Sequence, residues 1–96
     1  IQVTPPPRVI ANCVVRKVTG GIEITWDTSM VADANTLSIY RKKVGEDSFR
    51  RIANFTRIPT LYVDKAVTTG TLYSYVIQAD RGQHTMAKSD EKNIRY

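Results

Sequence analysis

Residues 67–79, Val-Thr-Thr-Gly-Thr-Leu-Tyr-Ser-Tyr-Val-Ile-Gln-Ala, constrain the fold of this chain more than any other stretch. A turn signal at Gly70 is followed by a regular alternation in which the residues on one side are Tyr73, Tyr75, Ile77 and Ala79. Side chains of a β-strand point alternately to two faces, so one face of this stretch is suited to a core. The sequence therefore predicts a central strand, with Tyr73, Tyr75 and Ile77 among the core residues.

A second alternation precedes it at residues 22–26, where Ile22, Ile24 and Trp26 are separated by polar residues. This is the clearest period-two pattern in the chain, and it predicts a half-buried strand. Trp26, the sole tryptophan, is the largest side chain on the apolar side. We therefore expect Trp26 to be a major contributor to the core.

Five more short segments read as strands: residues 9–15, 37–43, 49–53, 61–63 and 86–96. Polar or glycine-containing turns separate them, with a hairpin loop expected at residues 81–84, and no stretch sustains a helical period. Regular short strands with polar turns predict a β-sandwich or barrel. The length of 96 residues indicates one domain. We expect it to span residues 9–96 and to follow a stiff linker at residues 1–8, because residues 5–7 are all proline.

Composition excludes few functions. Hydrophobic residues make up 42% and charged residues 24%, which is ordinary for a globular domain, and no apolar run reaches the roughly 18 residues of a membrane helix. We expect no membrane insertion.

Cys13 is the one cysteine, so it forms no internal disulfide, and its valine neighbours indicate a small buried side chain. A net charge of +5 is compatible with anionic partners.

These patterns together resemble the fibronectin type III family over residues 7–96. The residues that carry the resemblance are Trp26 near the end of the second strand, Val67, Gly70 and Thr71 before the sixth, and Tyr73, Tyr75, Ile77 and Ala79 within it. Two positions depart from the family pattern: Thr69 stands where proline is usual, and Leu37 replaces an inward tyrosine. The chain has no paired cysteines.

The resemblance implies an all-β fold, a seven-stranded antiparallel β-sandwich of the immunoglobulin-like, fibronectin type III kind. One sheet would hold the first, second and fifth strands, and the other sheet the remaining four. Tyr73 would occupy the tyrosine-corner position, whose hydroxyl bonds to upstream backbone. We expect Tyr73→Phe to cost about 1–3 kcal/mol by leaving a buried acceptor unpaired.

The resemblance also implies a non-catalytic spacer or protein-interaction module within a larger, multidomain protein. Residues 39–42, Phe49 with Ile52, and residues 61–64 resemble the style of these domains in bacterial secreted enzymes, surface proteins and phage structural proteins. The expected location is therefore extracellular, at the cell surface or virion-associated. Expected partners are other domains of the same chain or a second protein.

A cluster of basic residues offers an alternative function. The candidate anion-binding residues are Arg41, Lys42, Lys43, Arg50 and Arg51, with Arg57 nearby. If their two strands pair, these residues share one sheet, although alternation separates Lys42 from Arg41 and Lys43. They would then bind an anionic glycan (an acidic polysaccharide) or an acidic protein surface; the alternative is an ordinary solvated face. We expect no nucleic acid partner, because Tyr40 is the one aromatic residue clearly interleaved with them.

No catalytic, cofactor or metal site is predicted. The one histidine, His84, lies in the expected hairpin loop, and no nucleophile motif or pair of carboxylates accompanies it. A single histidine and a distant cysteine do not support zinc. Asp27, Asp33 and Asn35 share a loop but match no complete calcium motif and are ordinary turn formers. Asn54 begins an N-glycosylation pattern, which matters only in a eukaryotic secreted chain.

Overall fold

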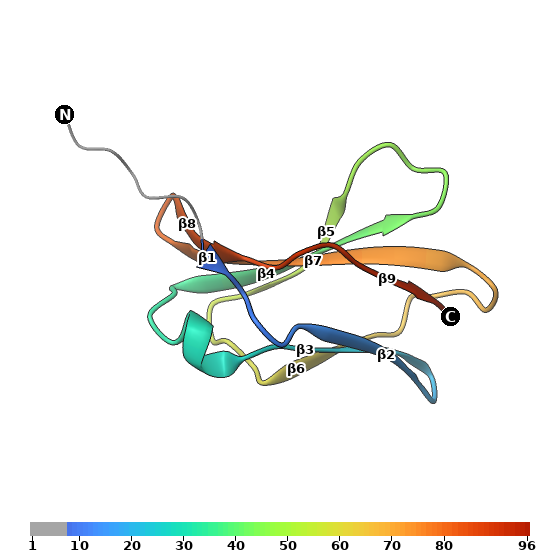
Figure 1. The fold of residues 1–96 in the computed structure, drawn as a ribbon, viewed down its shortest axis with the longest axis horizontal. Coiled ribbons are helices and arrows are strands. Elements are labelled where there is room, and N and C mark those ends of the chain that lie inside the picture. Colours follow the sequence, from blue (N-terminus) through green and yellow to red (C-terminus); the bar gives the residue numbers. More distant parts are fainter. Residues whose placement is uncertain (1–7) are drawn as a thin grey trace.

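The computed structural model describes residues 8–96, which form β-strands and one short 3₁₀ turn (Figure 1). The elements in chain order are β1 (Arg8–Val9), β2 (Val14–Val18), β3 (Gly21–Thr25), η1 (Thr28–Val31), β4 (Thr36–Lys43), β5 (Arg50–Phe55), β6 (Leu61–Asp64), β7 (Leu72–Arg81), β8 (His84–Lys88) and β9 (Lys92–Arg95). Within these residues, no helix is both long and apolar enough to cross a bilayer.

The strands form two sheets that face each other as the two layers seen in Figure 1. The larger sheet runs β1–β8–β7–β4–β5, with β9 also paired to β7, and the smaller sheet runs β2–β3–β6. All pairs are antiparallel except β1 with β8. This arrangement confirms the predicted β-sandwich, and β2, β3 and β6 contain parts of the expected first, second and fifth strands. Residues 8–96 form nine strands rather than seven, because the first and last predicted strands are each divided, and β1 joins the larger sheet.

The first strand differs from the prediction at residues 9–15. The chain leaves the larger sheet after β1, turns at Ala11 and Asn12, and enters the smaller sheet as β2. Asn12 has φ 57°, a left-handed conformation that asparagine tolerates better than most residues. β2 then continues to Val18, three residues beyond the predicted end of the strand at residue 15. Of the linker expected at residues 1–8, residues 1–7 lie outside the described residues, and Arg8 begins β1.

The last strand, predicted as residues 86–96, is divided into β8 and β9 by residues 89–91. The buried Ser89 makes both of its hydrogen bonds to one residue of β7. Its Oγ accepts from the Ile77 N–H at 2.9 Å, and its own N–H donates to the Ile77 carbonyl at 2.8 Å. The Ser89 hydroxyl thus takes the place of a backbone carbonyl as the acceptor for the Ile77 N–H. Regular pairing with β7 therefore stops after β8 and resumes at β9. The hairpin loop predicted at residues 81–84 is shorter than expected, because Arg81 and His84 pair with each other.

The core lies between the sheets and contains the four residues expected there. Trp26 is 6% exposed, Tyr73 3%, and Tyr75 and Ile77 are fully buried. Cys13 is also buried in this layer, and burial raises the pKa of its thiol. The alternation in β3 and β7 therefore points its apolar side to the facing sheet, as a half-buried strand requires.

Tyr73 forms the tyrosine corner, but with the opposite polarity to the one predicted. Its hydroxyl accepts a hydrogen bond from the Thr68 backbone N–H at 2.7 Å. Removing the hydroxyl therefore leaves a donor without its partner, and not an acceptor. The bond ties the start of β7 to the connection that precedes it.

Candidate functional site

The pairing of β4 with β5 decides where the basic cluster lies. Arg41 is directly opposite Arg50, and Tyr40 is directly opposite Arg51. Directly opposed residues of an antiparallel pair share a face. Arg41, Lys43 and Arg50 therefore face one side of the sheet, and Lys42 and Arg51 face the other. The five residues predicted as one anion-binding group are neighbours along the paired strands, but they do not form one surface.

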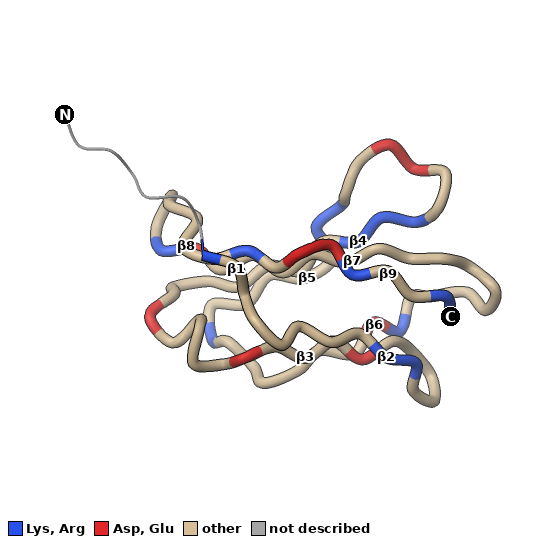
Figure 2. The backbone as a smooth tube through the Cα atoms, viewed as in Figure 1, with Lys and Arg blue, Asp and Glu red and all other residues tan. Residues whose placement is uncertain are grey.

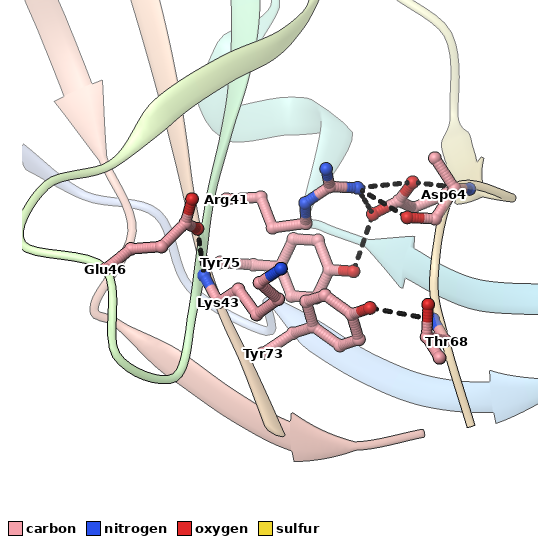
Figure 3. Close-up of polar contacts among 8 residues, drawn as sticks. Arg41, Lys43, Glu46, Asp64, Thr68, Tyr73 and Tyr75 are labelled. Atoms are coloured by element: carbon pink, nitrogen blue, oxygen red, sulfur yellow. Dashed lines mark hydrogen bonds and ion pairs between the residues drawn. The ribbon is translucent and has the colours of Figure 1, made fainter. Parts of the chain in front are cut away.

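Arg41 is largely engaged in joining the two sheets. Its Nη1 lies 2.8 and 3.1 Å from the two carboxylate oxygens of Asp64, at the end of β6, and 3.1 Å from the Ala66 carbonyl (Figure 3). The Tyr75 hydroxyl, from β7, donates to Asp64 Oδ2 at 2.7 Å. Asp64 is 2% exposed. We call Arg41, Asp64 and Tyr75 the Asp64 clasp.

The electrostatics of the clasp follow from this burial. Burial raises the pKa of Tyr75 far above its ordinary value, and the hydrogen bond to Asp64 raises it further, so Tyr75 is a neutral donor. Burial lowers the pKa of Arg41, but the hydrogen bond to Asp64 and the negative charge of Asp64 raise it by more, so the net shift is upward. Asp64 also accepts from the Ala66 N–H at 3.1 Å. Because Asp64 accepts from three separate groups, the clasp is a satisfied structural link between the sheets.

Beside the clasp lies a hollow of about 330 Å³ between the β4–β5 hairpin and the connection from β6 to β7. We call this hollow the basic notch; it is lined by Arg41, Lys43, Glu46, Arg50, Ala66, Thr68, Thr71 and Tyr73. Lys43 and Arg50 are exposed, and two threonines stand across from them on the connection. Ammonium, guanidinium and hydroxyl donors around one hollow form a suitable environment for a small anionic group.

Glu46 supplies the one carboxylate in the lining of the notch. Its Oε1 accepts from the Lys43 backbone N–H at 2.7 Å, which lowers the pKa of Glu46, and the Glu46 N–H donates back to the Lys43 carbonyl at 3.0 Å. These two bonds hold the turn of the β4–β5 hairpin. The same carboxylate partly offsets the positive charge of Lys43 and Arg50.

The opposite face of the larger sheet carries a second hollow, of about 290 Å³, that the sequence reading missed. We call it the outer groove; it is lined by Tyr40, Phe49, Val76, Gln78 and Lys88. Lys42, which faces this side, has its Nζ 5.2 Å from the centre of the Phe49 ring. The available signal was Val76, an apolar residue between the polar Ser74 and Gln78 on the outward side of the β7 alternation.

Two of the other sequence candidates, Asp27 and Asn35, have structural roles. Asp27 caps η1 by accepting from the Ser29 N–H at 3.0 Å and the Ser29 hydroxyl at 2.6 Å, and Asn35 accepts from the Gly82 N–H at 3.0 Å. Between residues 8 and 96, no three potential metal-ligating side chains gather. His84 is exposed at the start of β8.

Comparisons with known proteins identify the fold alone. No protein-family model matches the sequence, and no curated protein matches it significantly. Nine chains of solved structures match. One of them, described as "Myokine structure", aligns with a TM-score of 0.68 at 20% sequence identity, covering 94% of this chain and 97% of that chain. At this identity the likeness establishes a fibronectin type III-like β-sandwich and nothing about activity.

Proposed function

We propose that this domain is a non-catalytic spacer or protein-interaction module of a larger protein, in an extracellular, cell-envelope or virion-associated setting. We further propose that it is of the kind found in bacterial and phage proteins, because its predicted third to fifth strands resemble those domains. A fibronectin type III-like sandwich is typically used for spacing or binding, although a fold alone does not fix a function.

The observation that carries the spacing role is the position of the chain ends. β1 lies at one end of the sandwich and the C-terminus lies near the other (Figure 1). Two sheets packed across a shared core form a rigid body. A rigid body with chain ends at opposite poles sets a distance between whatever is joined to it.

Small-angle X-ray scattering on two copies of the chain joined in tandem tests this role. We expect the maximum dimension of the pair to exceed that of a single copy by about the length of one sandwich, because β1 and the C-terminus lie at opposite ends of the sandwich. A maximum dimension close to that of a single copy would mean that the copies fold back side by side, and the spacing role would be abandoned.

A second candidate function, binding of an anionic glycan or acidic surface, is favoured by the basic notch. The notch brings Lys43 and Arg50 together with the hydroxyl-bearing Thr68 and Thr71. Sulfate and carboxylate groups are recognised by such charged donors. The relevant residues are therefore Lys43 and Arg50, and not the whole predicted set of five.

Salt elution from heparin-agarose tests this candidate. We expect Lys43→Ala with Arg50→Ala to elute at clearly lower salt than the unmodified domain, since both exposed positive charges of the notch are removed. Arg57→Ala with Arg81→Ala is the matched control, because it removes the same charge from two exposed positions that line neither the notch nor the opposite face. Equal shifts for the two double variants would indicate a non-specific charge effect and refute a site in the notch.

A further inference from the structure

The outer groove differs from an ordinary solvated sheet face in its apolar floor. Val76 points away from the core, because its neighbours Tyr75 and Ile77 point into it, and yet Val76 is only 7% exposed. Tyr40 lies directly across from Val76 on β4 and shares that face. The β4–β5 hairpin, whose turn ends at Phe49, rises away from the smaller sheet beside this face (Figure 1).

Basic side chains surround this apolar floor. Lys42 lies on β4 and Arg51 on β5, the two strands of the hairpin, and Lys88 lines the groove from β8. Figure 2 shows basic residues on both strands of this hairpin and acidic residues at its tip. The acidic tip is Glu46 and Asp47, and the Glu46 side chain belongs to the basic notch. The acidic residue on the groove side of β7 is Asp80, which accepts from the Gln78 amide at 3.0 Å. The groove is thus apolar at its floor and has Lys42, Arg51 and Lys88 around it, while the exposed carboxylates Asp90 and Glu91 follow Lys88 on the connection to β9.

We propose that the outer groove binds an acidic peptide segment of a partner protein through one large apolar side chain. This proposal rests on the interaction role proposed above and names its site and partner chemistry. The apolar side chain would sit over Val76 between Tyr40 and Phe49, and flanking carboxylates would meet Lys42, Arg51 and Lys88.

The size of the groove supports a side chain as its occupant. Small-molecule sites usually enclose about 300–1,000 Å³, so a hollow of about 290 Å³ suits one anchoring side chain better than a whole cofactor. Aromatic anchors surrounded by arginine and other polar groups are typical of binding hot spots. Stacking of nucleotide bases is less favoured, because the floor of the groove is the aliphatic Val76 and not an aromatic ring.

Amide chemical-shift mapping on the ¹⁵N-labelled chain tests the proposal. The probe is a short peptide with a central tryptophan between glutamates. One control peptide replaces the glutamates with lysines, and a second replaces the tryptophan with serine. We expect the first peptide alone to shift amides of β4, β7 and β8 around Tyr40, Val76 and Lys88.

Charge-reversal variants give the quantitative arm. We expect Lys42→Glu with Lys88→Glu to weaken binding of the tryptophan–glutamate peptide at least about tenfold, because like charges would then face each other. Lys65→Glu, exposed on the β6–β7 connection, makes the same type of change away from the groove and should alter affinity less than about twofold. The amide spectra also report whether each variant is folded.

Several outcomes would overturn the proposal. Equal binding of the lysine-flanked peptide would remove the charge argument, and equal binding of the serine peptide would remove the anchor. Amide shifts confined to the basic notch would show that the peptide does not bind in the groove. Stronger binding of oligo-deoxythymidine than of the peptide in the groove would mean that its ligand is not an acidic peptide. Absence of shifts with every peptide would refute this site, while the scattering of the tandem chain would still decide the spacing role separately.

Discussion

Asp64→Asn is expected to destabilise the domain by roughly 3–5 kcal/mol, because it leaves the guanidinium of Arg41 partly buried without its counter-charge. The substitution keeps the size of the side chain, so the loss reports the charge and its hydrogen bonds rather than a cavity. The Arg41 side chain is 21% exposed, which places the expected loss toward the lower end of that range. Urea denaturation followed by the fluorescence of Trp26, the single tryptophan, measures the free energy of unfolding.

A matched control is available on the smaller sheet. Glu23 accepts from Arg16 Nε at 2.8 Å across β2 and β3, and the Arg16 side chain is 65% exposed. Glu23→Gln makes the same carboxylate-to-amide change in a solvated pair, so its cost should stay below about 1 kcal/mol. Tyr75→Phe removes one bond to Asp64 and should fall between the two. If Asp64→Asn costs no more than Glu23→Gln, the clasp does not stabilise the sandwich.

The clasp shows which part of the structure sequence reasoning did not reach. Alternation placed Tyr75 inward correctly, because a strand fixes which side each residue faces. It gave no reason to join Asp64 to Arg41, which is 23 positions earlier in the chain. That pair forms only when two strands from different sheets are brought together. The sequence shows only an aspartate at the end of a short apolar segment, and its burial, which requires a partner for the charge, is visible in the structure alone.

The basic residues illustrate a different limit. Alternation correctly separated Lys42 from Arg41 and Lys43, but it could not settle the partners on β5. The register shifts between Ile39 and Tyr40, whose partners are Ala53 and Arg51. The extra residue, Ile52, is a β-bulge, and a bulge changes which side chains oppose each other. Register of this kind depends on cross-strand contacts, which a single sequence does not display.

The position of the first strand was missed for a related reason. Residues 9–15 contain several β-forming residues, and these favour one continuous strand although Ala11 and Asn12 are poor strand formers. In the structure Ile10 and Cys13 are both buried, on either side of the turn at Ala11 and Asn12. The chain can fill the core at both positions by changing sheets. Tertiary packing thus overrides the local preference.

Trp26→Ala is expected to cost about 3–5 kcal/mol, because it removes the largest side chain of the core and leaves a cavity between the sheets. Typical domains are stable by only about 5–15 kcal/mol, so this variant should lie close to unfolding. Far-UV circular dichroism in urea gives the measurement, since the variant has no tryptophan to follow.

Trp26→Phe separates packing from polarity at the same position. The buried Trp26 Nε1 has no hydrogen-bond partner within the part of the chain that the structure describes. Burying an unpaired N–H costs about 1–3 kcal/mol, so phenylalanine loses ring area but also removes that penalty. We expect Trp26→Phe to cost less than half as much as Trp26→Ala. Equal costs for the two variants would mean that the indole nitrogen contributes favourably, in conflict with its unpaired position in the core.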